Sequence, residues 1–365
     1  MYINILLPYK EKFSKNKASS VSITVFNNLE HSCHKKKIKI FGQFVDKPMF
    51  KENFIGIKKS MNFLKSKNKT IADEMCKIIN NSNFSGNIIE IHNRPYLIKN
   101  IKSMLKKEHY LTLFFHNDPL EMKGSKTVSE RKYLISNLHK IYCVSKYVKK
   151  RFLEGISNEN DKNKIVVLYN GVKRKEQKPP KKVKEVIFVG RIVEEKGVQL
   201  YVDAIKNIYQ SHKEWRFKIV GSPKLGESKF DNFSYQIKKR FEDNGCRAKM
   251  LGFVNKTNLN KIMKRSSIIV IPSIWEEPFG LVAAEAMSYG IAIIASNVGG
   301  LPEIIGNNGI LIKKINSKVI SEKLNLLLSD KKILRKYQKK SWDNFNLDSR
   351  KISKILDKHR GNFIS

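Results

Sequence analysis

The chain has 365 residues, of which 41% are hydrophobic and 10% are aromatic. This composition supplies apolar surface for more than one core and excludes a disordered, collagen-like or low-complexity protein. With 71 Lys and Arg residues against 33 Asp and Glu residues, the formal charge is +38, which makes a polyanion such as nucleic acid or an anionic membrane a candidate partner.

The first half of the chain alternates short β-branched runs with segments long enough for crossover helices. This alternation predicts a parallel sheet covered by helices. The expected strands lie near residues 3–7, 38–45, 88–92, 110–116, 141–145 and 165–169. We therefore expect an N-terminal Rossmann-like domain over residues 1–172.

A charged, proline-bearing segment without apolar periodicity follows over residues 173–184 and is typical of a linker. A second series of strands is then expected near residues 186–189, 217–220, 250–253, 268–271, 291–295 and 310–312. It predicts a second Rossmann-like domain over residues 185–340, and a C-terminal helix within residues 341–365 is expected to cross back to the first domain. Two doubly wound α/β domains facing a central cleft would bind ligands at the carboxyl ends of their strands.

The most informative stretch of the sequence, residues 271–290, runs from a buried strand to a helix. The strand ends at Pro272, and the helix begins just after Pro278. The first N–H groups of a helix lack intrahelical acceptors and lie at its positive end, so the backbone around Phe279–Leu281 suits a diphosphate. Glu285 follows roughly 8 Å along the helix axis, where a carboxylate suits the ribose hydroxyls of the same ligand.

Glu277 and Glu285, with seven residues between them, resemble the E-x7-E signature of retaining glycosyltransferases of family 4, which have the GT-B fold. Phe188–Arg191 followed by Glu195–Gly197 is similar to that family's first C-terminal strand and its diphosphate-binding Arg and Lys pair. Val298–Glu303 resembles the family's next signature. The resemblance covers nearly the whole chain and is much stronger after residue 185. It implies a GT-B architecture with an acceptor-binding N-terminal domain and a donor-binding C-terminal domain.

The N-terminal half matches the family more loosely. His116 stands at the end of an expected strand, where the family has a histidine that faces the donor sugar. His92 ends another strand, and a purely structural role for it stays open. Ala18–Ser20 replaces the family's usual glycine pair in the first β-to-α loop, and Lys173 replaces an Asp that often follows the Asn-Gly-Val turn.

The expected leaving-group chemistry needs cations. No Asp-x-Asp pattern occurs in the sequence, so we expect neither a metal clamp on the diphosphate nor another cofactor. Departure of a nucleoside diphosphate builds negative charge on its β-phosphate, which preorganised cations stabilise in the transition state. The resemblance assigns this task to Arg191 and Lys196. It also implies a front-face, retaining displacement in which the leaving phosphate accepts the acceptor's proton.

The candidate site residues form two sets. The catalytic set comprises His116, Arg191, Lys196 and Glu277. The donor-binding set comprises Gly190, Ser222, Phe253, Val254, Phe279, Gly280, Leu281 and Glu285. Within it, Ser222, Phe253 and Val254 are expected near the base, with UDP and GDP both left open.

Together these patterns predict a retaining glycosyltransferase that moves a sugar from a nucleotide sugar to a hydroxyl of a glycan or lipid-linked acceptor. The expected pathway is synthesis of surface polysaccharide or lipopolysaccharide. Two alternatives stay open: a non-catalytic polyanion-binding protein, and a nucleotide-sugar epimerase of the same fold.

Charge, cysteines and hydropathy bear on partners and location. The basic excess is spread evenly along the chain, so we expect no nucleic-acid partner, although a cluster such as Lys35–Lys37 suits peripheral contact with anionic lipids. The four cysteines stand far apart without zinc-type spacing, and no stretch approaches 18 apolar residues. A cytoplasmic location is expected, with at most peripheral contact at the cytoplasmic membrane face.

Overall fold

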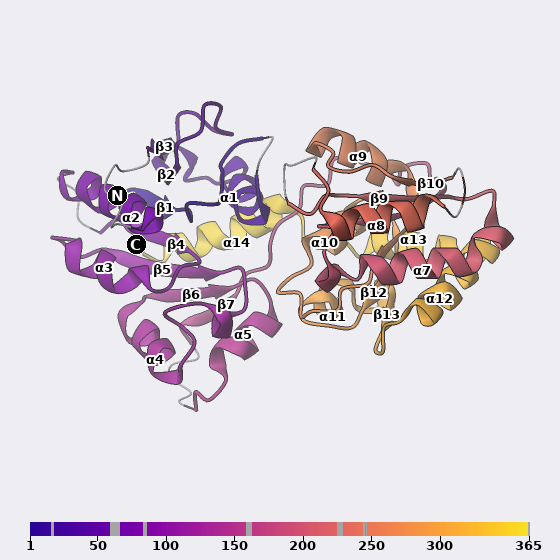
Figure 1. Cartoon of the computed structure of the whole chain (residues 1–365). Coiled ribbons are helices and arrows are strands. Elements are labelled where there is room, and N and C mark those ends of the chain that lie inside the picture. Colours follow the sequence, from indigo (N-terminus) through magenta and orange to yellow (C-terminus); the bar gives the residue numbers. More distant parts are fainter. Residues whose placement is uncertain are drawn as a thin grey trace. The chain divides into compact units, whose positions relative to one another are not determined.

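The computed structural model describes residues 1–15, 18–58, 66–82, 86–157, 163–224, 229–243, 245 and 247–363. The chain forms two compact units, which Figure 1 colours along the sequence. Unit 1 comprises Met1–Gly171 together with Ser349–Ser365, and unit 2 comprises Val172–Asp348. Unit 2 is therefore inserted into unit 1, which a C-terminal segment completes.

Unit 1 is built on a parallel sheet in the strand order β3-β2-β1-β4-β5-β6-β7. The strands are β1 (Ile3–Leu6), β2 (Ile38–Gln43), β3 (Phe54–Ile57), β4 (Ile88–His92), β5 (Tyr110–Phe115), β6 (Lys140–Cys143) and β7 (Ile165–Val167). Both β1 and β4 are buried at every position, as expected for parallel strands covered on both faces. The strand order reverses between them, so their carboxyl ends form a switch point of the kind at which α/β proteins bind ligands.

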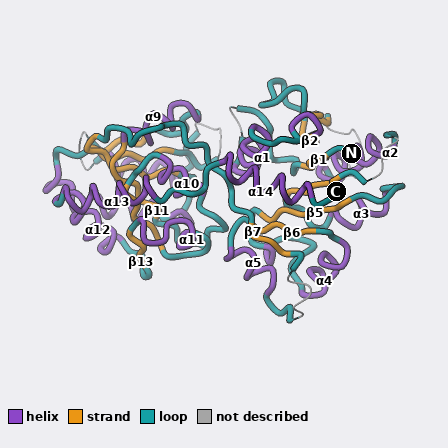
Figure 2. The backbone as a smooth tube through the Cα atoms, turned by 180° about the vertical axis from the view of Figure 1, so that it is seen from behind, coloured by secondary structure: helices purple, strands orange, loops and turns teal. Residues whose placement is uncertain are grey.

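Helices lie on either side of this sheet (Figure 2). They are α1 (Ser20–Glu30), α2 (Lys67–Asn80), α3 (Leu97–Met104), α4 (Val128–Asn137), α5 (Lys146–Leu153) and α14 (Ser349–Gly361), with short 3-10 turns η1 (Lys35–Lys37) and η2 (Pro119–Glu121). Capping side chains fix where some of these helices begin. Thr127 and Glu130 form a capping box at α4, and the Ser145 side chain caps α5.

Unit 2 has a parallel sheet in the order β10-β9-β8-β11-β12-β13. The strands are β8 (Val183–Val189), β9 (Arg216–Val220), β10 (Ala248–Met250), β11 (Ser266–Ile271), β12 (Ala292–Ser296) and β13 (Ile310–Ile312). The helices are α7 (Val198–Ile208), α8 (Asn232–Glu242), α9 (Lys256–Arg265), α10 (Leu281–Ser288), α11 (Leu301–Ile305), α12 (Ser317–Ser329) and α13 (Lys331–Asp343), with 3-10 turns η3 (Glu194–Lys196), η4 (Tyr209–His212) and η5 (Gly306–Asn308). The strand order reverses between β8 and β11, which places the switch point of this unit at their carboxyl ends.

The core of unit 2 joins its sheet to α7 and α12. Phe188 and Phe217 from the strands pack with Tyr201 of α7 and Leu324 of α12, and all four are at most 2% exposed. The hydroxyl of Tyr201 donates to the carbonyl of Val186 at 3.2 Å, so its polar end is satisfied inside the core. The sheet that carries the loops of this unit is therefore rigidly supported.

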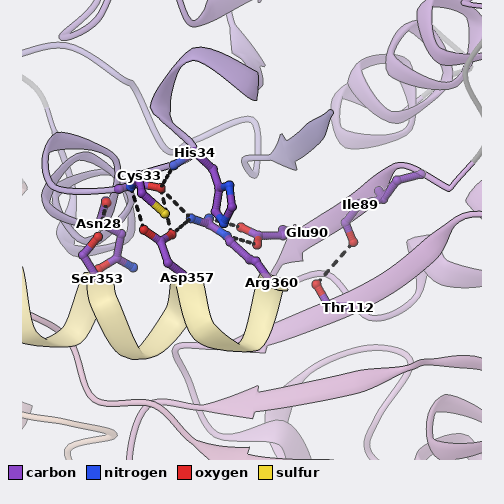
Figure 3. A network of polar contacts seen from close by, with 10 residues as sticks. Asn28, Cys33, His34, Ile89, Glu90, Thr112, Ser353, Asp357 and Arg360 are labelled. Carbon is purple, nitrogen blue, oxygen red and sulfur yellow. Dashed lines mark hydrogen bonds and ion pairs between the residues drawn. The ribbon is translucent and has the colours of Figure 1, made fainter. Parts of the chain in front are cut away.

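Helix α14 is fixed to unit 1 by a buried ionic network (Figure 3). Arg360 is 2% exposed and donates two hydrogen bonds, of 2.7 and 2.8 Å, to the carboxylate of Glu90 in β4. It also donates to Asp357 at 3.1 Å. Such a network specifies where the helix docks, because loss of either partner leaves an uncompensated buried charge.

The observed elements confirm the expected class of two Rossmann-like units with parallel sheets, and they add details. The edge strand β3 was not expected from the sequence. The helix expected around Trp342 is divided: Trp342 belongs to α13 of unit 2, and α14 of unit 1 starts at Ser349. The segment after Gly171 is part of unit 2, with β8 beginning at Val183.

Candidate functional site

The loop from β11 to α10 depends on Gly280, which precedes the helix with φ of 93°. A Cβ at this position would lie 2.5 Å from Cδ2 of Leu301. Glycine is therefore required both by the left-handed backbone and by the space available. The turn sets the start of α10 at Leu281, directly after the loop that follows β11. The first N–H groups of a helix have no intrahelical acceptors, so those of α10 lie near the carboxyl edge of the sheet.

Glu277 is held in this loop from three directions. Its Oε1 accepts hydrogen bonds from Nζ of Lys196 at 2.5 Å and from Oγ of Ser273 at 2.7 Å. Its backbone carbonyl accepts the N–H of Gly300 at 2.6 Å. Gly299 has φ of 55°, and a Cβ there would lie 2.2 Å from the same carbonyl oxygen. The Gly299–Gly300 pair thus lets the loop between β12 and α11 pack against the backbone of Glu277.

Lys196 reaches Glu277 because the chain turns sharply after it. Gly197 has φ of 68°, and a Cβ there would lie 1.9 Å from the carbonyl oxygen of Pro272. The Lys196 ammonium also lies 4.7 Å from the ring centroid of Trp275, a cation–π geometry. The structure therefore brings together two of the expected catalytic side chains, from the loops after β8 and β11.

Arg191 has a different environment. It forms an ion pair with Glu195, and both side chains are close to half exposed. Exposed pairs of this kind contribute little to stability, so a ligand anion can compete for the guanidinium. Arg191 shares a loop with Lys196 but makes no ion pair with Glu277.

Glu285 of α10 is 8% exposed, and its Oε1 accepts from Nζ of Lys256 at 2.5 Å. Its negative charge adds to burial in raising the pKa of Tyr289 to about 12. Sequence reasoning missed Lys256, the first residue of α9, because its partner lies 29 positions away. A ligand hydroxyl that hydrogen-bonds to this Oε1 has to share the oxygen with the Lys256 ammonium or displace the ammonium from it.

The remaining donor-binding candidates lie on neighbouring loops at the same edge of the unit 2 sheet. Gly190 follows β8, and its carbonyl oxygen would lie 1.8 Å from a Cβ at Gly221. Ser222 is buried, and its Oγ donates to the carbonyl of Lys224 at 2.6 Å. Phe253 and Val254 follow β10 and are half-buried. Phe279 is buried at the start of α10.

In unit 1, His116 follows β5 and contacts His92 at the end of β4. Nδ1 of His92 lies 2.8 Å from Nε2 of His116. The backbone N–H of His116 donates to the side-chain oxygen of Asn93 at 3.0 Å. Burial lowers the pKa of His116 to about 3, and burial, His116 and Arg360 together lower that of His92. Both rings are therefore neutral at physiological pH.

The turn after His92 has an unusual backbone. Asn93 and Arg94 have φ of 57° and 59°, and they are the only non-glycine residues with positive φ among those the structure describes. Two successive left-handed residues cost free energy, and such strain clusters at functional sites. The turn lies at the switch point of unit 1 and holds Asn93 against His116.

Glu11, in the loop after β1, is a half-buried acid that sequence reasoning missed. Burial raises its pKa to about 7, against the opposing charge of Arg94. Its buried Oε2 has no hydrogen-bond partner within the described ranges. A lone Glu after a strand gives no sequence signal of burial, because nothing local to it marks the site. In the same loop, Ser19 caps α1 without a side-chain hydrogen bond.

One group of side chains has metal-ligand chemistry among the residues that the structure describes: Cys33, His34 and Asp357 (Figure 3). The Asp357 carboxylate already accepts hydrogen bonds from Ser32, the Cys33 backbone and Arg360. A cation there would face the Arg360 guanidinium, so this set fits a docking contact better than a metal centre. Cys76 and Cys143 are free and buried, and Cys246 lies outside the described residues.

In the described ranges, no helix combines the length and the apolar character that crossing a bilayer requires. The 3-10 turn Lys35–Lys37 has no buried residue. The basic cluster singled out in the sequence is therefore on the surface of unit 1.

Two Rossmann-like units with parallel sheets are the architecture of the GT-B glycosyltransferases, and solved structures agree. A glycosyltransferase from Rickettsia africae superposes with a TM-score of 0.76 at 20% identity, covering 100% of this chain and 99% of that one. Anabaena HepE, solved in complex with UDP and glucose, has a TM-score of 0.74 at 14% identity and covers 99% and 100%. The fold is thus GT-B.

Sequence comparisons define the family. Residues 171–342 match the model described as glycosyl transferases group 1. An uncharacterized glycosyltransferase of Methanocaldococcus jannaschii is 34% identical over 269 residues, which span 70% of this chain and 71% of the relative. Spore coat protein SA of Bacillus subtilis is 27% identical over 66% of this chain and 69% of its own length. The chain belongs to the glycosyltransferase family.

Proposed function

We propose that this chain is a retaining glycosyltransferase of the family 4 type, which transfers a sugar from a nucleotide sugar to a hydroxyl of a glycan or lipid-linked acceptor. The observation that carries the proposal is the contact of Lys196 with Glu277, eight positions before the buried Glu285. Both glutamates of the E-x7-E spacing lie at the edge of the unit 2 sheet where α/β proteins bind ligands.

We assign the nucleotide to unit 2. The diphosphate would bind the N–H groups at the start of α10, around Gly280 and Leu281, and the ribose hydroxyls would bind Glu285. Ser222 and the Phe253–Val254 loop would adjoin the base. We favour a UDP-type donor over a GDP-type donor, because HepE, which shares the fold, was solved in complex with UDP and glucose.

The proposed chemistry is a front-face displacement without a metal or other cofactor. The bond from the anomeric carbon to the diphosphate oxygen breaks, the bond to the acceptor oxygen forms on the same face, and the acceptor's proton passes to the departing phosphate. Arg191 and Lys196 would stabilise the charge that develops on that phosphate. Glu277 would hold Lys196 in position, and His116 would contact the transferred sugar.

We assign the acceptor to unit 1 and the reaction to surface polysaccharide synthesis at the cytoplasmic membrane face. Relatives support this pathway by name: spore coat protein SA of Bacillus subtilis, and a protein encoded in the cps region of Klebsiella pneumoniae. The exposed Lys35–Lys37 turn offers charge for peripheral contact with anionic lipids.

The test begins with a panel of nucleotide sugars in a thermal-shift assay, followed by mass spectrometry of the products. The Glu285→Gln variant should bind UDP about 10- to 100-fold more weakly, because a hydrogen bond to a charged group contributes about 1.5–3 kcal/mol. The matched control is Glu214→Gln, which precedes β9 at the opposite edge of the same sheet. Equal affinity of wild type and Glu285→Gln for UDP, GDP and their sugars would refute the assignment. An epimerase would instead yield an isomerised sugar without any glycosylated acceptor.

A further inference from the structure

His92 and His116 are joined by a hydrogen bond between their rings. The two ring planes differ by 17° and the centroids are 5.1 Å apart, while Nδ1 of His92 and Nε2 of His116 are 2.8 Å apart. The rings therefore meet edge to edge, which is the geometry of an N–H···N bond. One nitrogen has to donate and the other has to accept.

A single proton lies between these rings, because neither is charged. The side chains are only 2% and 8% exposed, and burial lowers both pKa values. The positive charge of Arg360, which is fixed by Glu90 and Asp357, also acts against a proton on His92. Each ring carries one N–H, so the direction of the shared bond determines both tautomers.

The surroundings of His92 favour one direction. Its Nε2 is buried and has no hydrogen-bond partner among the described residues. If His116 were the donor, His92 would carry its proton on this Nε2, which would be a buried N–H without an acceptor and near a positive charge. If His92 donates through Nδ1, Nε2 is left as a lone pair in the field of Arg360, which is the less costly arrangement.

The consequence for His116 follows directly. Its Nε2 is then the acceptor, so its own proton is on Nδ1. The ring keeps part of its surface exposed, and its backbone N–H is held by Asn93, whose N–H in turn donates to the carbonyl of Phe114 at 2.7 Å. His116 thus has a fixed backbone and a fixed ring partner.

We propose that His92 is a positioning residue for His116: it donates its Nδ1–H to Nε2 of His116 and so leaves His116 a neutral ring whose Nδ1–H can be donated to a substrate oxygen. The role toward substrate rests on the function proposed above, whereas the tautomer does not. A hydroxyl or ring oxygen of a sugar is the class of group that such a donor would bind.

The primary test is the tautomer itself, measured by long-range ¹H–¹⁵N NMR on deuterated protein with ¹⁵N-labelled histidine. Loss of signals in His92→Phe and His116→Gln assigns the two rings among the eight histidines of the chain. We expect His116 to carry its proton on Nδ1 at neutral pH. A proton on Nε2 of His116 in the wild type would overturn the proposal without any variant.

Two substitutions at His92 separate donation from packing. His92 stacks on Phe114 with centroids 4.4 Å apart. His92→Phe retains an aromatic ring there and removes the donor, whereas His92→Asn retains an N–H close to the Nδ1 position. We expect His116 to shift toward the Nε2–H form in His92→Phe and to keep its Nδ1–H in His92→Asn. An unchanged tautomer in His92→Phe would also overturn the proposal.

Kinetics give a second readout, using hydrolysis of the nucleotide sugar that produces the largest thermal shift. His92→Phe should lower kcat about tenfold, the factor that corresponds to one hydrogen bond of ordinary strength, and His92→Asn should stay within about twofold of wild type. Equal impairment of both variants would contradict a donor role. If wild-type protein neither hydrolyses a nucleotide sugar nor transfers its sugar to any acceptor tested, the proposed function fails, and the spectrum alone decides the tautomer.

Discussion

Arg191 and Lys196 are both proposed to bind the leaving diphosphate, but they start from different contacts. Lys196 is bound to Glu277 and packs on Trp275, so it is already oriented. Among the residues that the structure describes, Arg191 pairs with the exposed Glu195, and it has to exchange that partner for the ligand. The difference predicts that Lys196 acts mainly through preorganisation and Arg191 through charge.

Replacing either residue by Ala should lower turnover by about 10²- to 10³-fold, the range for removing one group that stabilises the charge developing in the transition state. The control neutralises Lys35, Lys36 and Lys37 together, which removes more charge at an exposed turn of unit 1. Initial rates with a soluble acceptor should be compared near 0.15 M ionic strength, where the Debye length is about 8 Å. If the triple variant has a lowered rate and Arg191→Ala has the rate of wild type, turnover depends on the total positive charge of the protein and not on Arg191.

The raised pKa of Glu11 predicts a pH-dependent cost to stability. Its pKa rises from 4.5 to about 7 on folding, so the folded state holds the proton more tightly and loses stability as pH increases through that window. Glu11→Gln lacks this loss. The free energy of unfolding of Glu11→Gln relative to that of wild type should therefore increase by roughly 2–3 kcal/mol between pH 5 and pH 8.

Thermal melting at pH 5 and pH 8 measures this effect. Glu74→Gln is the matched control, since Glu74 is an exposed acid of unit 1 paired with Lys77. The control should track wild type at both pH values. If Glu11→Gln gives the same change in melting temperature at pH 5 and pH 8, Glu11 does not titrate in this window.

Single residues also show where sequence reasoning stops. Glu277, Glu285 and Lys196 were expected because they belong to short motifs whose spacing resembles a family signature. In the structure, Lys196 and Glu277 lie in the connections after β8 and β11, and Glu285 lies within α10. Glu11 and Lys256 were not expected, since their environments are made by residues far away in the sequence. A buried carboxylate and an ion pair across 29 positions leave no periodicity or local pattern to detect.

Among the elements, the loops of unit 2 depend on glycines that permit close backbone approach. Gly299 and Gly306 both have left-handed φ, of 55° and 51°. A Cβ at Gly299 would clash with the carbonyl of Glu277, whereas a Cβ at Gly306 would meet nothing within 4 Å. Comparing alanine substitutions at these two glycines therefore separates the effect of backbone strain from the effect of a steric clash.

Gly306→Ala should cost roughly 1–3 kcal/mol of stability, because φ of 51° with ψ of −133° is a backbone conformation that side chains other than glycine rarely adopt, and it should leave UDP affinity unchanged. Gly299→Ala should cost more and weaken UDP binding at least tenfold, because the loop that carries Glu277 must move. Calorimetric titration with UDP and thermal melting give both quantities. Equal UDP affinity in the two variants would show that the position of Glu277 does not matter for the nucleotide.

Element prediction from sequence succeeded where strands are buried and β-branched. β4 and β11 are such runs, and both were expected near their observed positions. β3 was missed because Phe54–Ile57 is short and half-buried at an edge. The break between α12 and α13 rests on one capping side chain, Asp330, which accepts from the N–H groups of Lys332 and Ile333, a signal easily lost in a Lys-rich helical segment.

For the whole molecule, the proposed leaving-group chemistry predicts turnover in the presence of EDTA. Side-chain cations would replace a metal clamp, so chelation should change the rate by less than about twofold. The measurement compares initial rates with and without EDTA, and then after addition of Mg²⁺ or Mn²⁺. Complete loss on chelation with recovery on adding metal would refute the cationic-pair chemistry.

The discontinuous makeup of unit 1 has a consequence for biosynthesis. Glu90 is in the centre of a sheet that precedes unit 2 in the sequence, and its partner Arg360 lies on a helix that follows unit 2. Until that helix leaves the ribosome, the nascent sheet contains an uncompensated carboxylate, whereas the whole of unit 2 is already complete. Folding on the ribosome should therefore reverse the usual order of N-terminal domain first, with the inserted unit forming before the unit that encloses it in sequence.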